Sequence, residues 1–311
     1  MLILGEVHTG LLQNSTAISQ DDATAILDVV LGERVRRSER PIAYAVSPDR
    51  LTGVDCRLPT ATGSRTRAVG TVASRAAITG GHVLQGSAFA MVTPGREPRR
   101  LAWSYYLARP GRLETIGKVD LTDLRNGQVR ATDSERSLDL GAIAGRAMDD
   151  AQRSRLLDRR APLRTQRTRL RWLVSPTPEE DATATVSTAF SVESDTMRTL
   201  VLRVPVPSLP AVVDLCEDLA LHDWLLTTMV SYVDRRITAQ VSPAERVAQL
   251  RPAIDHLLHL WMPAARVAEP LLPVWDALER RPGFTRQWET SVSRIRDQVA
   301  LSAVLSDRAG R

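Results

Sequence analysis

The spacing of apolar residues changes from a period of two to a period of 3.6 at Ser208, and this change most constrains the fold. Before Ser208, short runs alternate apolar and polar residues with a period of two, which is typical of strands. After it, apolar residues recur at i, i+3, i+4 and i+7, the period of an amphipathic helix. We therefore expect an α+β protein with a β-rich N-terminal region in 1–120, a mixed segment in 121–206 and a helical domain in 207–311.

The first 120 residues contain short extended runs separated by turn residues. The clearest hairpin joins 68–79 to 82–92 through Gly80-Gly81, because this pair supplies the positive φ that a two-residue primed turn requires. Ser19 is a predicted N-cap for a short helix. Further strands are expected over 2–9, 41–47, 51–58, 101–108 and 113–119.

The middle segment is expected to begin with a polar loop over 121–136. A helical pattern from Leu140 to Ala151 should continue into the arginine-rich stretch and stop before Pro162. Alternating residues then predict a three-stranded antiparallel meander over 168–206, packed on the first region.

The last hundred residues indicate four helices. Ser242-Pro243-Ala244-Glu245 is the strongest start signal in the chain, with serine as N-cap, proline at N1 and glutamate at N3. Pro252 is expected to break that helix. The four helices are predicted over 209–235, 242–261, 271–281 and 285–306.

Motif searches exclude several common function classes. GxGxxG, GxxxxGK[ST], HExxH and GxSxG are absent, so we expect no cofactor. The two cysteines, Cys56 and Cys216, are far apart and are expected to be free thiols. The first residues lack a basic region and a long apolar region, and no apolar run approaches 18 residues; a cytoplasmic protein without membrane contact is expected.

Positive charge is concentrated in residues 153–171. This stretch holds eight arginines and one acid, Asp158, a net charge of +7, while the whole chain carries only +5. Such a segment could contact an acidic protein, bind nucleic acid or form a solvated face. Trp172 is the only neighbouring aromatic residue available to stack on bases. The eight arginines are Arg153, Arg155, Arg159, Arg160, Arg164, Arg167, Arg169 and Arg171.

Two sets of histidines are weak candidates for chemistry. Glu6 and His8 are two apart on a predicted strand and so share one face, where they could act as an acid–base pair with His82 as a third member. His256 and His259 are three apart on a predicted helix and could share a metal, although two ligands alone do not make a site. In both sets, ordinary packing or a polar face explains the pattern as well.

Three long segments resemble an actinobacterial family that is labelled only by a Streptomyces coelicolor locus tag, number twenty-five twenty-one. They are GEVHTGLLQNSTA (Gly5–Ala17), RRSERPIAYAVSPDRLTGVDCRLPTATG (Arg36–Gly63) and RAVGTVASRAAITGG (Arg67–Gly81). The resemblance implies no activity and no catalytic residues. It implies a genomic context in which a variant P-loop protein and a methyltransferase-like protein are encoded nearby and could be partners.

The sequence as a whole favours a non-enzymatic protein-interaction component of a multi-protein system. The first alternative is a nucleic-acid-binding module that uses the 153–171 segment. The second is an enzyme of another type that uses Glu6, His8 and His82.

Overall fold

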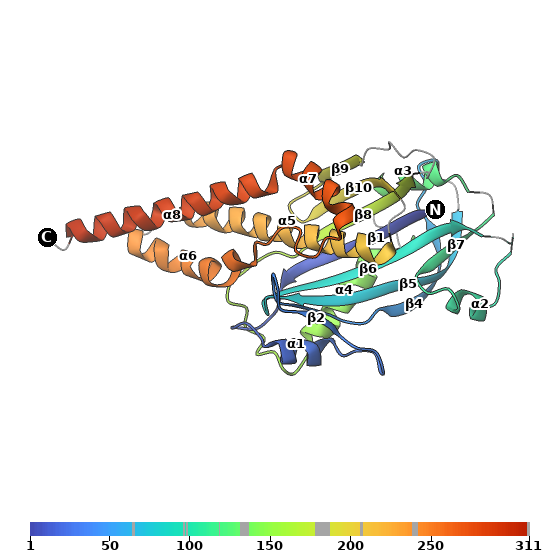
Figure 1. Cartoon of the computed structure of the whole chain (residues 1–311), viewed down its shortest axis with the longest axis horizontal. Helices are drawn as coiled ribbons and strands as arrows, with labels where there is room; N and C mark the ends of the chain where they lie inside the picture. Colours follow the sequence, from blue (N-terminus) through green and yellow to red (C-terminus); the bar gives the residue numbers. More distant parts are fainter. Residues whose placement is uncertain are drawn as a thin grey trace.

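A mixed sheet of ten strands, with helices on both faces, forms the centre of the molecule (Figure 1). The computed structural model describes residues 1–63, 66–95, 97, 99–117, 119–130, 137–177, 187–205, 208–237 and 242–309. This architecture confirms the α+β class.

The strands are β1 (Leu2–Leu11), β2 (Arg36–Ser38), β3 (Tyr44–Val46), β4 (Arg50–Leu58), β5 (Thr66–Thr79), β6 (Val83–Pro94), β7 (Arg112–Ile116), β8 (Thr168–Thr177), β9 (Ser187–Val192) and β10 (Met197–Pro205). The helices are α1 (Gln20–Leu27), α2 (Trp103–Leu107), α3 (Leu121–Arg130), α4 (Leu140–Gln152), α5 (Leu209–Ile237), α6 (Pro243–Leu257), α7 (Leu272–Arg280) and α8 (Phe284–Ala309), with short 3-10 helices η1 (Leu258–Leu260) and η2 (Glu269–Leu271).

Strand β1 lies in the interior of the sheet and joins the two predicted β regions. It pairs antiparallel with β6 along one edge and with β8 along the other. The strand order is β2-β3-β5-β7-β6-β1-β8-β10-β9, with β4 paired to β5. The residues before 120 and those after 168 therefore build one sheet.

The predicted antiparallel meander over 168–206 is wrong in its strand order. β9 and β10 are antiparallel neighbours, but β10 lies between β8 and β9 and runs parallel to β8. Leu200 is opposite Trp172 in one pairing and opposite Phe190 in the other. Alternation of apolar residues tells which side chains share a face, but not which strand is the neighbour.

The hairpin between β5 and β6 is confirmed. Gly80 and Gly81 have φ of +59° and +66°, a conformation that favours glycine. Thr79 is opposite Val83, so the loop comprises 80–82 and His82 belongs to the turn rather than to the strand.

Two further predictions are corrected at the edge of the sheet. Residues 101–108 were expected to be a strand, but they contain α2, whose Trp103 and Tyr106 rings pack 6.0 Å apart. Residues 121–136 were expected to be a loop, but 121–130 form α3, which places Leu124 in the core; 131–136 lie outside the described residues. Both helices are short and rely on packing against the sheet, which local sequence does not encode.

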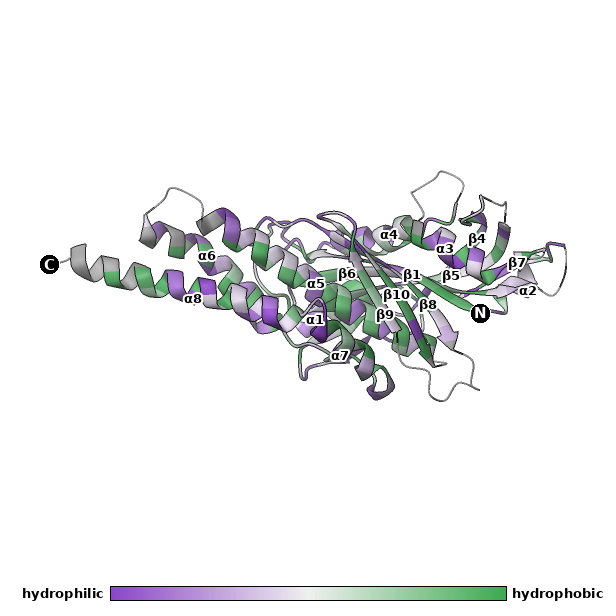
Figure 2. Cartoon of the chain, turned by 90° about the horizontal axis from the view of Figure 1, so that it is seen from above, coloured by the Kyte–Doolittle hydropathy of each residue, from purple (hydrophilic) through white to green (hydrophobic). Residues whose placement is uncertain are grey.

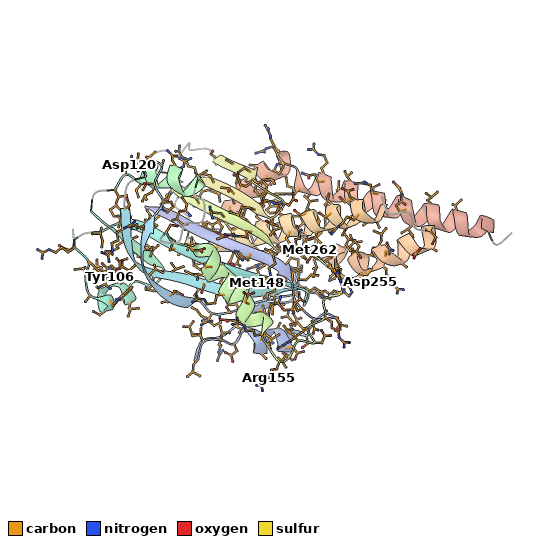
Figure 3. All side chains as sticks on the ribbon, turned by 180° about the vertical axis from the view of Figure 1, so that it is seen from behind. Tyr106, Asp120, Met148, Arg155, Asp255 and Met262 are labelled. Atoms are coloured by element: carbon orange, nitrogen blue, oxygen red, sulfur yellow. The ribbon has the colours of Figure 1, made fainter. Side chains whose placement is uncertain are left out.

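Helix α4 packs across β6 and β1 on one face of the sheet, and Met148 marks its position in Figure 3. Close approach depends on glycine: a Cβ at Gly86 of β6 would lie 2.3 Å from the Ala144 carbonyl oxygen. The prediction that this helix continues into the arginine stretch is wrong, because α4 ends at Gln152. Beyond it, the Asn14 side chain accepts a hydrogen bond from the Asp158 backbone amide, in place of a helical bond.

Helix α5 covers the opposite face, and α6 and α8 pack beside it. The three helices extend well beyond the sheet toward the C-terminus (Figures 1 and 2). Ser242 caps α6 as predicted and accepts a hydrogen bond from the Glu245 amide at 3.2 Å. Pro252 lies inside α6 without ending it, which corrects the expected break.

Both cysteines are free; Cys216 is buried and Cys56 partly buried. Among the described residues, none of the helices combines the length and the apolar content needed to cross a bilayer.

Candidate functional site

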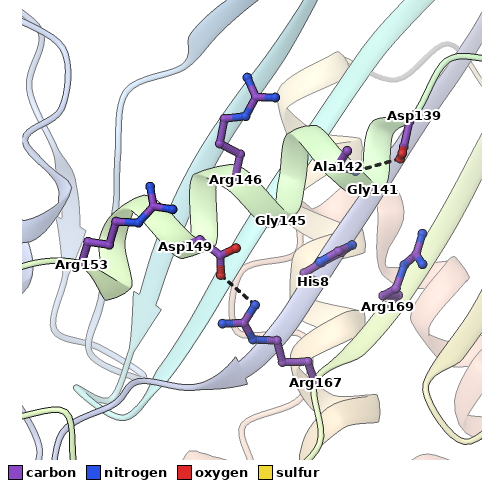
Figure 4. Close-up of a pocket in the computed structure, with 10 residues that line it drawn as sticks. All are labelled: His8, Asp139, Gly141, Ala142, Gly145, Arg146, Asp149, Arg153, Arg167 and Arg169. Atoms are coloured by element: carbon purple, nitrogen blue, oxygen red, sulfur yellow. Dashed lines mark hydrogen bonds and ion pairs between the residues drawn. The ribbon is translucent and has the colours of Figure 1, made fainter. Parts of the chain in front are cut away.

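A pocket of about 480 Å³ opens between α4 and the neighbouring strands β1 and β8 (Figure 4). Four arginines contribute to its wall, and we call it the arginine pocket. Its lining residues are His8, Asp139, Gly141, Ala142, Gly145, Arg146, Asp149, Arg153, Arg167 and Arg169.

Glycines on α4 allow the helix to approach the charged side chains of the strands. A Cβ at Gly141 would lie 2.6 Å from both Glu6 Oε1 and Arg169 Nη2, so no larger residue fits there without movement. One turn later, a Cβ at Gly145 would lie 3.4 Å from the His8 ring, an ordinary contact. These two glycines bring the α4 backbone directly over Glu6 and His8.

Glu6 lies beneath the pocket and organises it. Register places Glu6 opposite Arg171 and His8 opposite Arg169. The Arg169 Nε donates to Glu6 Oε1 at 2.7 Å, the Arg171 Nε reaches Oε2 at 3.5 Å, and the His8 Nε2 lies 3.3 Å from Oε1. Glu6 itself is 2% exposed.

Burial acts to raise the pKa of Glu6, but the hydrogen bond with His8 and the charges of Arg169 and Arg171 outweigh it and lower the pKa to about 2. Glu6 is therefore ionised at neutral pH. It acts as an anchor for three basic side chains rather than as a proton donor.

Other carboxylates hold two more arginines of the pocket. Arg167 donates to Asp149 at 2.8 Å, and Arg153 donates to Asp150 at 3.0 Å. Arg146 is exposed on α4 and has no ion pair with any residue that the structure describes.

The predicted basic segment thus divides into two parts. Arg153, Arg167 and Arg169 line the pocket, and Arg171 lies beneath it on Glu6. The other four arginines are exposed between α4 and β8; they are Arg155, Arg159, Arg160 and Arg164. Acidic partners offset part of the +7 charge, which a count along the sequence does not reveal. Trp172 is 1% exposed, so it offers no stacking surface.

The structure brings Glu6 and His8 together but places His82 elsewhere. His8 faces α4, whereas His82 contacts His256 of α6, which packs with the helices of the opposite face. His82 Nε2 lies 3.2 Å from His256 Nδ1, and the His82 and His259 rings are 6.2 Å apart. His82 therefore lies beside the predicted pair His256 and His259. Even so, no group of three or more His, Cys, Asp or Glu in the described part of the chain is placed to hold a metal ion.

Sequence reasoning missed a buried ionic cluster between the sheet and α5. Arg75 of β5 donates through Nε to Glu217 Oε1 at 2.7 Å and through Nη2 to Oε2 at 3.0 Å. Glu217 also accepts from Arg266 and from the Ser87 hydroxyl. Burial acts to raise the pKa of Glu217, but the charges of Arg75 and Arg266 and the hydrogen bonds of Arg75 and Ser87 lower it to about 2. The available signal was an arginine among small residues in a strand and acids within an otherwise apolar helix.

Comparison of the chain with models of protein families, with curated proteins and with solved structures finds no match.

Proposed function

We propose that the chain is a non-enzymatic interaction component that works in the cytoplasm, and that the arginine pocket binds an acidic segment of a partner protein. The observation that carries this proposal is that four arginines, Arg146, Arg153, Arg167 and Arg169, line one pocket. Guanidinium groups bind carboxylates through two parallel N–H donors, so a surface of this kind suits aspartate- or glutamate-rich partners.

The arginines are oriented before any partner arrives. Glu6, Asp149 and Asp150 hold Arg169, Arg167 and Arg153 respectively. A side chain that is already ordered loses less conformational entropy on binding, which strengthens the interaction. Arg146 adds a cation without such a carboxylate among the described residues.

The resemblance of the N-terminal segments directs the choice of partners. We propose the P-loop protein and the methyltransferase-like protein of the same genomic neighbourhood as the first two to test. Both classes carry chemistry for which this sequence has no motif.

Nucleic-acid binding receives less support from the geometry. Arg153, Arg167, Arg169 and Arg171 each have a carboxylate partner, and Trp172 is covered. A site for single-stranded nucleic acid also offers aromatic rings on which bases stack, and the covered Trp172 provides none. Filter binding of single- and double-stranded DNA and RNA across a salt series distinguishes the two functions, since retention that falls steeply with salt indicates phosphate contacts.

Of the three residues predicted for acid–base catalysis, the structure brings only Glu6 and His8 together. The Glu6–His8 contact could orient the imidazole, but both Glu6 oxygens are also engaged by arginines. A His8→Gln variant that binds partners normally supports the interaction function over the enzymatic one.

The decisive experiment compares two charge-reversal variants in binding to the candidate partners. Arg146→Glu with Arg167→Glu reverses two charges of the pocket, and Arg280→Glu with Arg296→Glu reverses two exposed charges on α7 and α8. We expect the pocket variant to weaken partner binding by about tenfold or more, because like charges at an interface cost several kcal/mol. The α7–α8 variant should bind as the wild type does.

Unfolding midpoints establish that both variants remain folded. Equal affinity of the pocket variant and the wild type for every partner that the wild type binds would exclude the proposed function.

A further inference from the structure

Three of the five histidines gather at the junction between the sheet and the projecting helices. His82 lies in the β5–β6 turn, His256 on α6 and His259 on η1. The His82 and His256 rings are 4.7 Å apart and meet edge to face, with 3.2 Å between His82 Nε2 and His256 Nδ1. At that distance one nitrogen must donate and the other accept, so at least one of the two rings must carry a proton on only one nitrogen.

The turn that carries His82 is fixed on several sides. The Gly80 amide donates to the Ala43 carbonyl at 2.7 Å, and the Ile18 amide donates to the Gly81 carbonyl at 3.1 Å. Leu260 of η1 packs directly on Gly80, where a Cβ would lie 2.2 Å from its Cδ2. The η1 end of α6 is therefore seated on the turn, while the rest of α6 packs between α5 and α8.

Charged groups on the surrounding elements have other partners. On α6, Asp255 pairs with Arg251 at 3.3 Å. On α1, Asp21 pairs with Arg37 at 3.1 Å, and Asp22 accepts from the Ser19 hydroxyl at 2.7 Å.

The carboxylates of α5 near the cluster that the structure describes have partners of their own. On α5, Glu217 pairs with Arg75 and with Arg266, and His222 lies beside Asp218. Burial and then the charges of His256 and His259 lower the pKa of His82 to about 4, and no carboxylate of the described residues is among the causes. Burial and His256 lower the pKa of His259 as well.

We propose that the three histidines form a proton-sensitive latch, in which the neutral rings hold the η1 end of α6 on the β5–β6 turn and protonation of more than one ring releases it. Two positive rings at this separation repel each other and lose their shared hydrogen bond. Because the folded-state pKa of His82 is depressed, the latch is at full strength above about pH 6.5 and weakens as the pH falls toward 4. None of the three histidines lines the arginine pocket, so this inference does not depend on the proposed function.

Hydrogen–deuterium exchange at pH 7.5 and pH 4.5, corrected for intrinsic rates, tests the latch. We expect amide protection in 80–82 and 256–262 to fall at least tenfold at the lower pH, while protection within β1 and β6 is retained. A His82→Gln, His256→Gln double variant should show the same protection at both pH values. His8→Gln is the matched control: it makes the same substitution at a histidine outside the cluster, beside Glu6 in the arginine pocket, and it should keep the wild-type response.

Trp261 gives a second readout that needs no substitution. It follows η1 directly and stacks on Trp288 with ring centroids 4.4 Å apart, so release of η1 should change the summed fluorescence of the six tryptophans over the same pH range. Unchanged protection of the wild type between the two pH values would overturn the latch. So would a loss of protection that persists in the double glutamine variant, or one that includes β1 and β6.

Discussion

The two faces of the sheet carry arginine–carboxylate clusters of the same chemistry in opposite surroundings. Under α5, the side chains of Glu217, Arg75 and Arg266 are 0%, 4% and 3% exposed. Under α4, Glu6 is equally covered at 2%, but its partner Arg169 is 31% exposed. The same residue types are thus buried from solvent on one face and partly open to solvent on the other.

Solvent access decides what each cluster can do. A buried ion pair stabilises the fold only as a pair, since loss of one partner leaves a charge that neither protein nor water compensates. An ion pair with one open side can exchange part of its contact for a ligand or for water. The α5 face should therefore control stability, and the α4 face should control binding.

The largest expected effect comes from neutralising Glu217. We expect Glu217→Gln to lower the free energy of unfolding by about 3–5 kcal/mol, because Arg75 and Arg266 remain buried and only the partly exposed Asp214 is left as their counter-charge. Glu6→Gln should cost less, below about 2 kcal/mol, since water reaches Arg169. Urea unfolding of both variants at neutral pH measures the difference, and equal losses would refute the distinction between the faces.

Acid should lower the stability of the protein by protonating Glu217 on one face of the sheet and Glu6 on the other. The pKa values of Glu6 and Glu217 are lowered from 4.5 to about 2, so each contributes stability that is fully present above pH 4.5 and is lost as the pH falls toward 2. At about 1.4 kcal/mol per pKa unit, the loss for buried Glu217 is at most about 3 kcal/mol. We expect the stability gap between the wild type and Glu217→Gln to narrow steadily from pH 5 to pH 2.5. A gap that stays constant would contradict the assignment.

A smaller effect should separate the two glycines of α4. Gly141→Ala places a methyl group 2.6 Å from Glu6 Oε1 and Arg169 Nη2, and we expect a loss of about 1–3 kcal/mol. Gly145→Ala meets only an ordinary contact with His8 and should be neutral or stabilising by up to about 1 kcal/mol. Thermal unfolding of both variants compares the same substitution at two positions of one helix.

The smallest effect is expected for an arginine–carboxylate pair that has the same two-bond geometry but is exposed to solvent. Arg67 donates to both oxygens of Asp55 at 2.7 Å, a geometry close to that of Arg75 on Glu217. The Arg67 side chain is 53% exposed, so Asp55→Asn should leave the urea midpoint indistinguishable from that of the wild type. A large shift would show that bond geometry, rather than burial, sets the contribution.

Local signals in the sequence predicted the elements that are locally determined. The change of period at Ser208, the Ser242 cap and the Gly80-Gly81 turn all rest on interactions between close neighbours, and the structure has them. The order of β8, β10 and β9 depends on pairing across the sheet, and α2 and α3 depend on packing. Those features were accordingly mispredicted.

The candidate site shows the same division. The strand period alone placed Glu6 and His8 on one face. Their arginine partners follow about 160 residues later, in the 153–171 segment, for which the sequence predicts a net charge of +7 with Asp158 as the one acid. A charge count along the chain does not reveal a counter-ion that lies on another strand. For the same reason it does not reveal which arginines pair with the carboxylates of an interior helix such as α5.

The interior position of β1 also determines when this protein can assemble during synthesis. Its pairing along one edge needs β6, which leaves the ribosome early, but the other edge stays open until residues 168–174 have emerged. For that interval the nascent chain exposes a row of free backbone amides and carbonyls beside apolar side chains, the kind of edge that invites mispairing between chains. Completion of the sheet is thus a late event in translation, and slow elongation between β7 and β8 would prolong the period in which the growing polypeptide is most prone to aggregate.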